Sequence, residues 1–320
     1  MRYAMMVFAA ATMSLWSGHG SAQPYPAKPI RIITAEVGGG NDFTARLIAQ
    51  GLTANLGQQV IVENRGGASG AIAAQLLAKA APDGYTLLSY TASLWIAPFL
   101  RDAPAFDPSK EFVPISLTVS SPNILVVHPS LPAKSAKDLI NLAKAKPGQL
   151  NYGSGSSGST PHLAAELFKA MAGVNIVRIS YRGNGAAYSD LIGGQIQVMF
   201  ATTGGAAPHV KSGRLRPLAT TSAEPSALLP GLPTVAASGL PGYESVSIVG
   251  AFAPLGTHHA LIMRINQEIA NALNKPDIKD KFFTAGVETV GSTPEKLTAT
   301  IHYEMTRLGK VIKDAGIRAD

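Results

Sequence analysis

The feature that most constrains the fold is a strand, a glycine-rich loop and a helix, which follow one another twice along the chain. The first copy lies in KPIRIITAEVGGGNDFTARLIAQGLTANL, where residues 30–34 read as a strand and residues 43–56 as a helix. The second, LNYGSGSSGSTPHLAAELFKAMA, has a strand at 150–152 and a helix at 162–172. A further strand follows each helix, so each copy begins a βαβ unit and a parallel sheet.

Two β-rich stretches without a helix, at 112–129 and 243–254, separate the alternating segments. We interpret them as strands that cross between two domains, with the C-terminal helices returning to the first domain. The predicted fold is α/β with two lobes, each a mostly parallel sheet flanked by helices, joined by crossing strands beside a cleft. The expected boundaries are 23–122 plus 248–320 for lobe 1 and 123–247 for lobe 2.

Residues 1–22 have the pattern of a secretory signal peptide. Arg2 precedes an apolar run from Ala4 to Trp16, which is too short to span a bilayer, and small and polar residues follow it. We expect cleavage before Gln23 and a soluble, exported mature protein. A buried N-terminal helix is the alternative, but no helix cap or charged face accompanies the run.

Composition argues against several kinds of site and partner. The chain has no cysteine, which excludes disulfides, zinc–thiolate sites and cysteine nucleophiles. Lysine and arginine outnumber aspartate and glutamate by 27 to 20, but they are scattered singly, so we expect no nucleic-acid partner. His258 and His259 are adjacent and lack the i, i+4 spacing of a helical metal pair, so no metal site is predicted.

Both glycine-rich loops are predicted to lie at the carboxyl ends of parallel strands, where open α/β sheets bind ligands. Thr160 is a good N-cap and Pro161 fits the first helical position, so the amides of that helical turn should face the cleft. Free N–H groups and the helix dipole favour a carboxylate or phosphate without a cationic side chain. Hydroxyl groups at serines 154, 156, 157 and 159 add donors.

Residues 153–158 also match G-x-G-x-x-G, the pattern of a dinucleotide-binding turn. That interpretation requires an acidic residue about 20 positions further on, where this chain has Arg178 and Arg182 instead. No G-x-S-x-G elbow or P-loop occurs, and His162 is expected to make a polar contact at the cleft edge. We therefore predict no cofactor and no catalytic residues, with an NAD(P)-dependent enzyme or a hydrolase as the alternative.

Two acidic residues, Glu36 and Asp42, flank the first glycine-rich loop. Asp42 is predicted to be the N-cap of the helix that begins near Phe43. Glu36 at the mouth of a cleft must meet solvent or a partner, which could be Arg65, Arg182 or a cationic group on the ligand.

Several blocks of the mature chain match one known family in sequence and in order. They include VENRGGASG, KAAPDGYTLL, KPGQLNYGSGSSGSTPHLAAELFK, LIGGQIQVMF, PHVKSGRLRPLATTS and VGSTPEKL. With these blocks the chain resembles the substrate-binding proteins of tripartite tricarboxylate transporters, the Bug or TctC-like family. The resemblance implies a periplasmic Venus-flytrap protein that closes on one small ligand, usually a carboxylate held by backbone amides, hydroxyls and bridging water.

The resemblance also places the site. It implies a first loop at residues 38–42, a second at 154–162 and a third contributor after QVMF. The predicted ligand-binding residues are Glu36, Gly38, Gly39, Gly40, Asn41, Asp42, Tyr90, Thr91, Ser154, Ser156, Ser157, Gly158, Ser159, Thr160, His162, Arg182, Ala201 and Thr202.

Two positions depart from the family pattern. The family usually has an aromatic or aliphatic residue where this chain has Glu36, and an acid or amide pair where it has Ala201 and Thr202. We hypothesise a ligand with a hydroxyl, amide or cationic group near Glu36. Unchanged affinity and ligand preference in a Glu36→Gln variant would refute that hypothesis.

The implied protein is a monomer that binds a small organic acid or related metabolite and delivers it to the membrane permease subunits of a tripartite tricarboxylate transporter. A ligand-loaded sensor that docks on a membrane signalling protein is an alternative within the same fold.

Overall fold

The computed structural model describes residues 25–35, 37–38, 40–66, 70–100, 108–155, 157–181 and 183–318. The predicted signal peptide lies outside these ranges, as do four predicted site residues: Glu36, Gly39, Ser156 and Arg182. Within the described ranges, each helix is too short or too polar to span a lipid bilayer.

The first half of the molecule is built on three parallel strands in the order β2-β1-β3. The strands are β1 (Ile30–Thr34), β2 (Val60–Asn64) and β3 (Thr86–Thr91), and the helices are α1 (Gly40–Leu56), α2 (Ala71–Ala78), α3 (Ser93–Leu100) and α4 (Pro108–Glu111). Apolar residues of β1 point to both faces: Ile33 belongs to one buried cluster and Ile32 to another. Burial on both faces is typical of a sheet covered by helices on each side.

The second half repeats this arrangement, with parallel strands in the order β7-β5-β6. The elements are α5 (Ala136–Ala145), β5 (Asn151–Ser154), α6 (Thr160–Ala172), β6 (Val177–Ser180), α7 (Asn184–Ile192), β7 (Val198–Thr202), α8 (Thr203–Lys211) and β8 (Arg216–Thr220). The repeated strand, loop and helix of the sequence therefore form two similar half-sheets.

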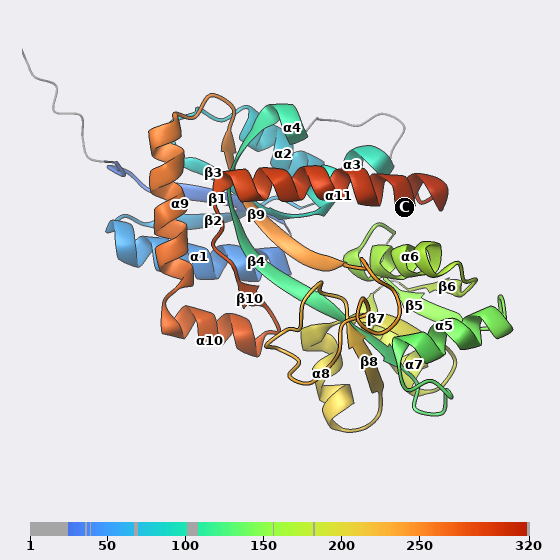
Figure 1. The fold of residues 1–320 in the computed structure, drawn as a ribbon. Coiled ribbons are helices and arrows are strands. Elements are labelled where there is room, and N and C mark those ends of the chain that lie inside the picture. Colours follow the sequence, from blue (N-terminus) through green and yellow to red (C-terminus); the bar gives the residue numbers. More distant parts are fainter. Residues whose placement is uncertain are drawn as a thin grey trace, which may run out of the picture.

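Two long strands connect the halves, β4 (Phe112–Val127) and β9 (Val246–Pro254). The first part of β4 pairs antiparallel with β9, and its last residues pair with β7 and β8 in the second half (Figure 1). The predicted two-lobed α/β fold with crossing strands is confirmed. Each lobe is more mixed than expected, because the crossing strands add antiparallel pairs to the parallel ones. The lobe boundaries expected at 122/123 and 247/248 fall inside β4 and β9.

The C-terminal segment packs against the first half. It comprises α9 (His259–Leu273), α10 (Pro276–Thr284), β10 (Glu288–Thr289) and α11 (Pro294–Asp314). Helix α9 packs on α1, and α11 packs on α3 and reaches α6 of the second half. Figure 1 shows α11 lying across the molecule above α6. Leu297 and Ile301 of α11 share a core with Trp95 and Phe252.

Candidate functional site

A cavity of about 380 Å³ lies between the two halves; we call it the cleft. The first half contributes Gly40, Thr44, Thr91, Ala285 and Val287; the second contributes Thr160, Pro161, Thr202, Gly204 and Gly205. The crossing strands supply Val119, Ser121, Asn123, Ser247 and Val249. Within the described part of the chain, these lining residues include no aspartate, glutamate, lysine, arginine or histidine.

Three helices begin at the cleft. Gly40 is the first residue of α1, Thr160 is the first of α6, and Thr202 is the N-cap of α8; all three line the cavity. The first N–H groups of a helix lack partners within it, and the peptide dipoles give that end a partial positive charge. Three converging N-termini therefore make the cleft suited to an anion, although its lining side chains are uncharged.

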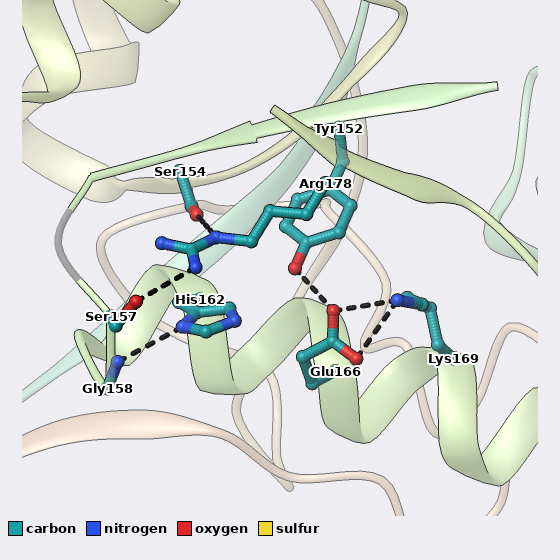
Figure 2. Close-up of polar contacts among 8 residues, drawn as sticks. All are labelled: Tyr152, Ser154, Ser157, Gly158, His162, Glu166, Lys169 and Arg178. Carbon is teal, nitrogen blue, oxygen red and sulfur yellow. Dashed lines mark hydrogen bonds and ion pairs between the residues drawn. The ribbon is translucent and has the colours of Figure 1, made fainter. Parts of the chain in front are cut away.

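The loop between β5 and α6 is held from inside by Arg178 of β6. Its Nε donates to Ser154 Oγ at 2.9 Å, Nη1 donates to Ser157 Oγ at 3.0 Å, and Nη2 donates to the Gly155 carbonyl at 2.8 Å. Figure 2 shows the guanidinium between the Ser154 and Ser157 hydroxyls, with a hydrogen bond to each. In a dinucleotide-binding unit, an acid in this part of the sequence would bind the ribose. Here a cation instead fixes the glycine-rich loop.

His162 supports the same loop. Its Nδ1 accepts a hydrogen bond of 3.0 Å from the Gly158 amide, and its ring is buried (Figure 2). The predicted polar contact is present, but His162 is not among the residues that line the cleft or the cavity adjoining it, and its buried ring supports the loop. Gly158 has φ 77°, a left-handed conformation that favours glycine.

A buried polar contact ties β5 to α6. The Tyr152 hydroxyl donates to Glu166 Oε1 at 2.5 Å, and Lys169 Nζ donates to both Glu166 oxygens at 2.7 and 3.0 Å (Figure 2). Burial, followed by the charge of Glu166, raises the pKa of Tyr152, so the hydroxyl keeps its proton. This contact fixes the orientation of the helix whose N-terminus faces the cleft.

Asp42 does not act as the predicted N-cap, because α1 begins two residues earlier, at Gly40. The Asp42 carboxylate instead reaches back and accepts from the Gly38 amide at 2.9 Å and from Asn64 Nδ2 at 2.8 Å. It also pairs with Arg46 Nε at 2.9 Å. Burial opposes ionisation of Asp42, but these hydrogen bonds outweigh it and lower its pKa.

The cap of α6 also differs from the prediction by one residue. Ser159 is the N-cap and Thr160 the first helical residue, which moves Pro161 to the second position. Ser159 makes no capping hydrogen bond, and its buried Oγ has no partner within the described ranges.

The structure brings part of the predicted site residue set to the cavities. Gly40, Thr91, Thr160 and Thr202 line the cleft, and Gly158 and Ser159 line an adjoining cavity. The other described members are not among the lining residues of either cavity: Gly38, Asn41, Asp42, Tyr90, Ser154, Ser157, His162 and Ala201.

Sequence reasoning missed the contribution of the crossing strands, above all Asn123. Asn123 is 1% exposed and lines the cleft, and its side-chain Nδ2 has no hydrogen-bond partner within the described ranges. A buried unpaired donor costs about 1–3 kcal/mol, which an acceptor on a ligand or a water molecule would offset. In the sequence, the signal for this position was a single asparagine directly before the apolar run ILVV.

The two halves approach each other closely at Gly204. A Cβ atom added there would lie 2.7 Å from the Ala285 carbonyl oxygen, closer than real contacts allow. Nearby, Ser121 Oγ donates to the Gly286 carbonyl at 2.8 Å. Gly204 therefore allows α8 to reach the segment after α10, whereas a Cβ atom added at Gly205 would lie 2.5 Å from the Tyr188 hydroxyl.

Comparisons with known proteins agree with this geometry. Residues 44–317 match the model of the tripartite tricarboxylate transporter family receptor. The chain is 35% identical to Protein BugT of Bordetella pertussis, over 93% of this chain and 92% of the relative. Rpa4515 of R. palustris, solved with adipate, superposes with a TM-score of 0.76 at 35% identity, covering 92% of this chain and 99% of that one.

A second solved structure, MatC from Rhodopseudomonas palustris with bound malate, gives a TM-score of 0.72 at 27% identity, covering 90% of this chain and all of that one (100%). Family match, relatives and fold agree over nearly the whole described chain. The chain therefore belongs to the tripartite tricarboxylate transporter receptor family, the TctC or Bug solute-binding proteins.

Proposed function

We propose that this protein is a periplasmic solute-binding protein that captures a small organic acid in the cleft and delivers it to the permease subunits of a tripartite tricarboxylate transporter. The observation that carries the proposal is the convergence of the N-termini of α1, α6 and α8 on a cavity whose described lining has no charged side chain. Backbone amides there would hold a carboxylate, with Asn123 Nδ2 as a further donor.

The comparisons support this class of ligand. Two family members of the same fold were solved with adipate and malate, which are both dicarboxylates. The cleft is lined from both halves and the crossing strands, so a ligand that contacts both halves would favour the closed arrangement.

Export rests on the sequence pattern of residues 1–22 together with the family match. The proposal of delivery to a permease is based on the family match. The alternative is that the ligand-bound protein docks on a membrane sensor. Co-purification of the loaded and the ligand-free protein with candidate permease subunits would separate these outputs.

A thermal-shift screen of the exported chain tests the binding proposal. The ligands are carboxylates, the fully amidated forms of the same acids, which have no carboxylate, and NAD(P). A carboxylate at 100 times its dissociation constant should add about 2.7 kcal/mol of stability, while its amide should add little. A response to NAD(P) alone, or equal responses to acids and amides, would refute the proposal.

A further inference from the structure

A second cavity of about 270 Å³ adjoins the cleft, and Thr91, Thr160 and Pro161 line both. We call it the side chamber. It extends toward α11, from which Glu304 and Arg307 line it, and toward the N-cap of α6, Ser159. A ligand held at the N-terminus of α6 could therefore extend past Thr91 and Thr160 into the chamber.

The side chamber contains a buried acceptor. Glu304 is 4% exposed, and Trp95 Nε1 donates to its Oε2 at 3.0 Å. Its other oxygen, Oε1, makes no hydrogen bond among the described residues. Glu304 lines the chamber, so an occupant that donates a hydrogen bond to this carboxylate is favoured there.

The chamber also contains unused donors. Arg307 Nη1 donates to the Glu244 carbonyl, but Arg307 Nε is buried and has no partner within the described ranges. The buried Ser159 Oγ is likewise without a partner there. Among the described residues, the wall of this cavity thus carries one carboxylate oxygen that can accept a hydrogen bond and two buried donors without a partner.

Different ligand groups satisfy this set unequally. A second carboxylate would accept from Arg307 and Ser159 but would meet the Glu304 carboxylate, whereas an ammonium would meet the Arg307 guanidinium. An alkyl end would leave all three atoms unsatisfied. A carboxamide donates through its NH₂ group and accepts through its carbonyl, and it carries no charge.

We propose that the side chamber is a specificity subsite for an uncharged carboxamide at the far end of a ligand whose carboxylate lies at the helix N-termini of the cleft. This inference rests on the proposed function, since the carboxylate end anchors the ligand.

Isothermal titration calorimetry with matched ligands tests the proposal. The ligand series are ω-carboxamide acids (succinamic, glutaramic and adipamic), their parent diacids, and unbranched monocarboxylic acids of the same chain lengths. The titrations are run at about pH 8. Burial raises the pKa of Glu304 to about 7, so at pH 8 this carboxyl is mostly ionised. We expect the best carboxamide acid to bind about tenfold tighter than its diacid and its alkyl analogue.

Glu304→Gln provides the sharper test. The glutamine carbonyl can still accept from Trp95, but its NH₂ group then points a donor into the chamber. The ranking should reverse, so that the diacid binds more tightly than the carboxamide acid. Glu295→Gln, an exposed position in the first turn of the same helix, is the matched control and should leave the ranking unchanged.

Each outcome decides the matter. If the order of affinities for the carboxamide acid and the diacid reverses in Glu304→Gln but not in Glu295→Gln, the subsite is supported. If the order stays the same in Glu304→Gln, the subsite proposal is overturned, while carboxylate binding in the cleft is not affected. If no acid binds to the wild type, the proposed function and the subsite both fall. If Glu304→Gln does not fold by circular dichroism, Ser159→Ala decides: it should weaken the carboxamide acid more than the alkyl acid, and equal weakening overturns the subsite.

Discussion

Replacing Glu304 by glutamine is expected to remove a large component of the pH dependence of folding stability. Burial raises the pKa of Glu304 to about 7 from its ordinary value of 4.5, although the Trp95 hydrogen bond and the Arg307 charge oppose the rise and Glu244 adds to it. The folded protein therefore keeps this proton at pH values where the unfolded chain has released it. Its free energy of unfolding must fall as the pH rises from about 4.5 to about 7.

The magnitude follows from the two pKa values. Each unit of pKa difference corresponds to about 1.4 kcal/mol, so the rise to about 7 corresponds to about 3 kcal/mol. Glutamine has no proton to release and preserves the shape and the Trp95 acceptor. Relative to wild type, Glu304→Gln should gain about 3 kcal/mol of unfolding free energy between about pH 4 and about pH 8, with the change confined to that window.

Urea denaturation of both proteins across this pH range measures the difference, in which the other titrating groups cancel. Glu295→Gln is the control: hydrogen bonds from its own backbone amide and from Thr293 lower the pKa of the exposed Glu295, so its effect has the opposite sign and is complete by about pH 4.5. A difference between Glu304→Gln and wild type that does not change with pH would refute the assignment of a raised pKa to Glu304.

Three further substitutions test other contacts. Gly204→Ala should weaken ligand binding about tenfold by calorimetry, because the new Cβ would lie 2.7 Å from the Ala285 carbonyl oxygen and hold the halves apart. Gly185→Ala is the control and should have no such effect, because a Cβ at that position meets nothing within 4 Å. Arg178→Met should weaken ligand binding about tenfold and leave the circular dichroism spectrum unchanged, because the loop between β5 and α6 loses three hydrogen bonds and its preorganisation. A variant that binds with wild-type affinity would show that the guanidinium does not hold the loop for binding. Tyr152→Phe should lower the unfolding free energy by about 2 kcal/mol in urea, since Glu166 loses a buried donor; no loss would mean that the hydroxyl contributes nothing.

The sequence predicted the fold well because the signals are local and repeated. Strand β1 was predicted at its observed bounds, and the helix-free stretch at 112–129 became the crossing strand β4. Periodicity and glycine turns carry this information without any knowledge of tertiary contacts. The early start of α1 at Gly40 was missed, because cap assignment depends on where Asp42 finds donors.

The candidate site was less accessible from the sequence. The loops could be found from their glycines, but the roles of Arg178 and His162 beneath the second loop depend on strand register and ring orientation. Asn123 and Glu304 come from a crossing strand and a C-terminal helix, far in sequence from the loops. Tertiary packing brings these two residues to adjoining cavities beside the loops.

The most direct test of the central claim is a crystal structure of the protein with the acid that gives the largest thermal shift. We predict that its carboxylate lies in the cleft and accepts hydrogen bonds from the first-turn amides of α1, α6 or α8. A carboxylate held instead by lysine or arginine side chains away from these helix N-termini would contradict that claim.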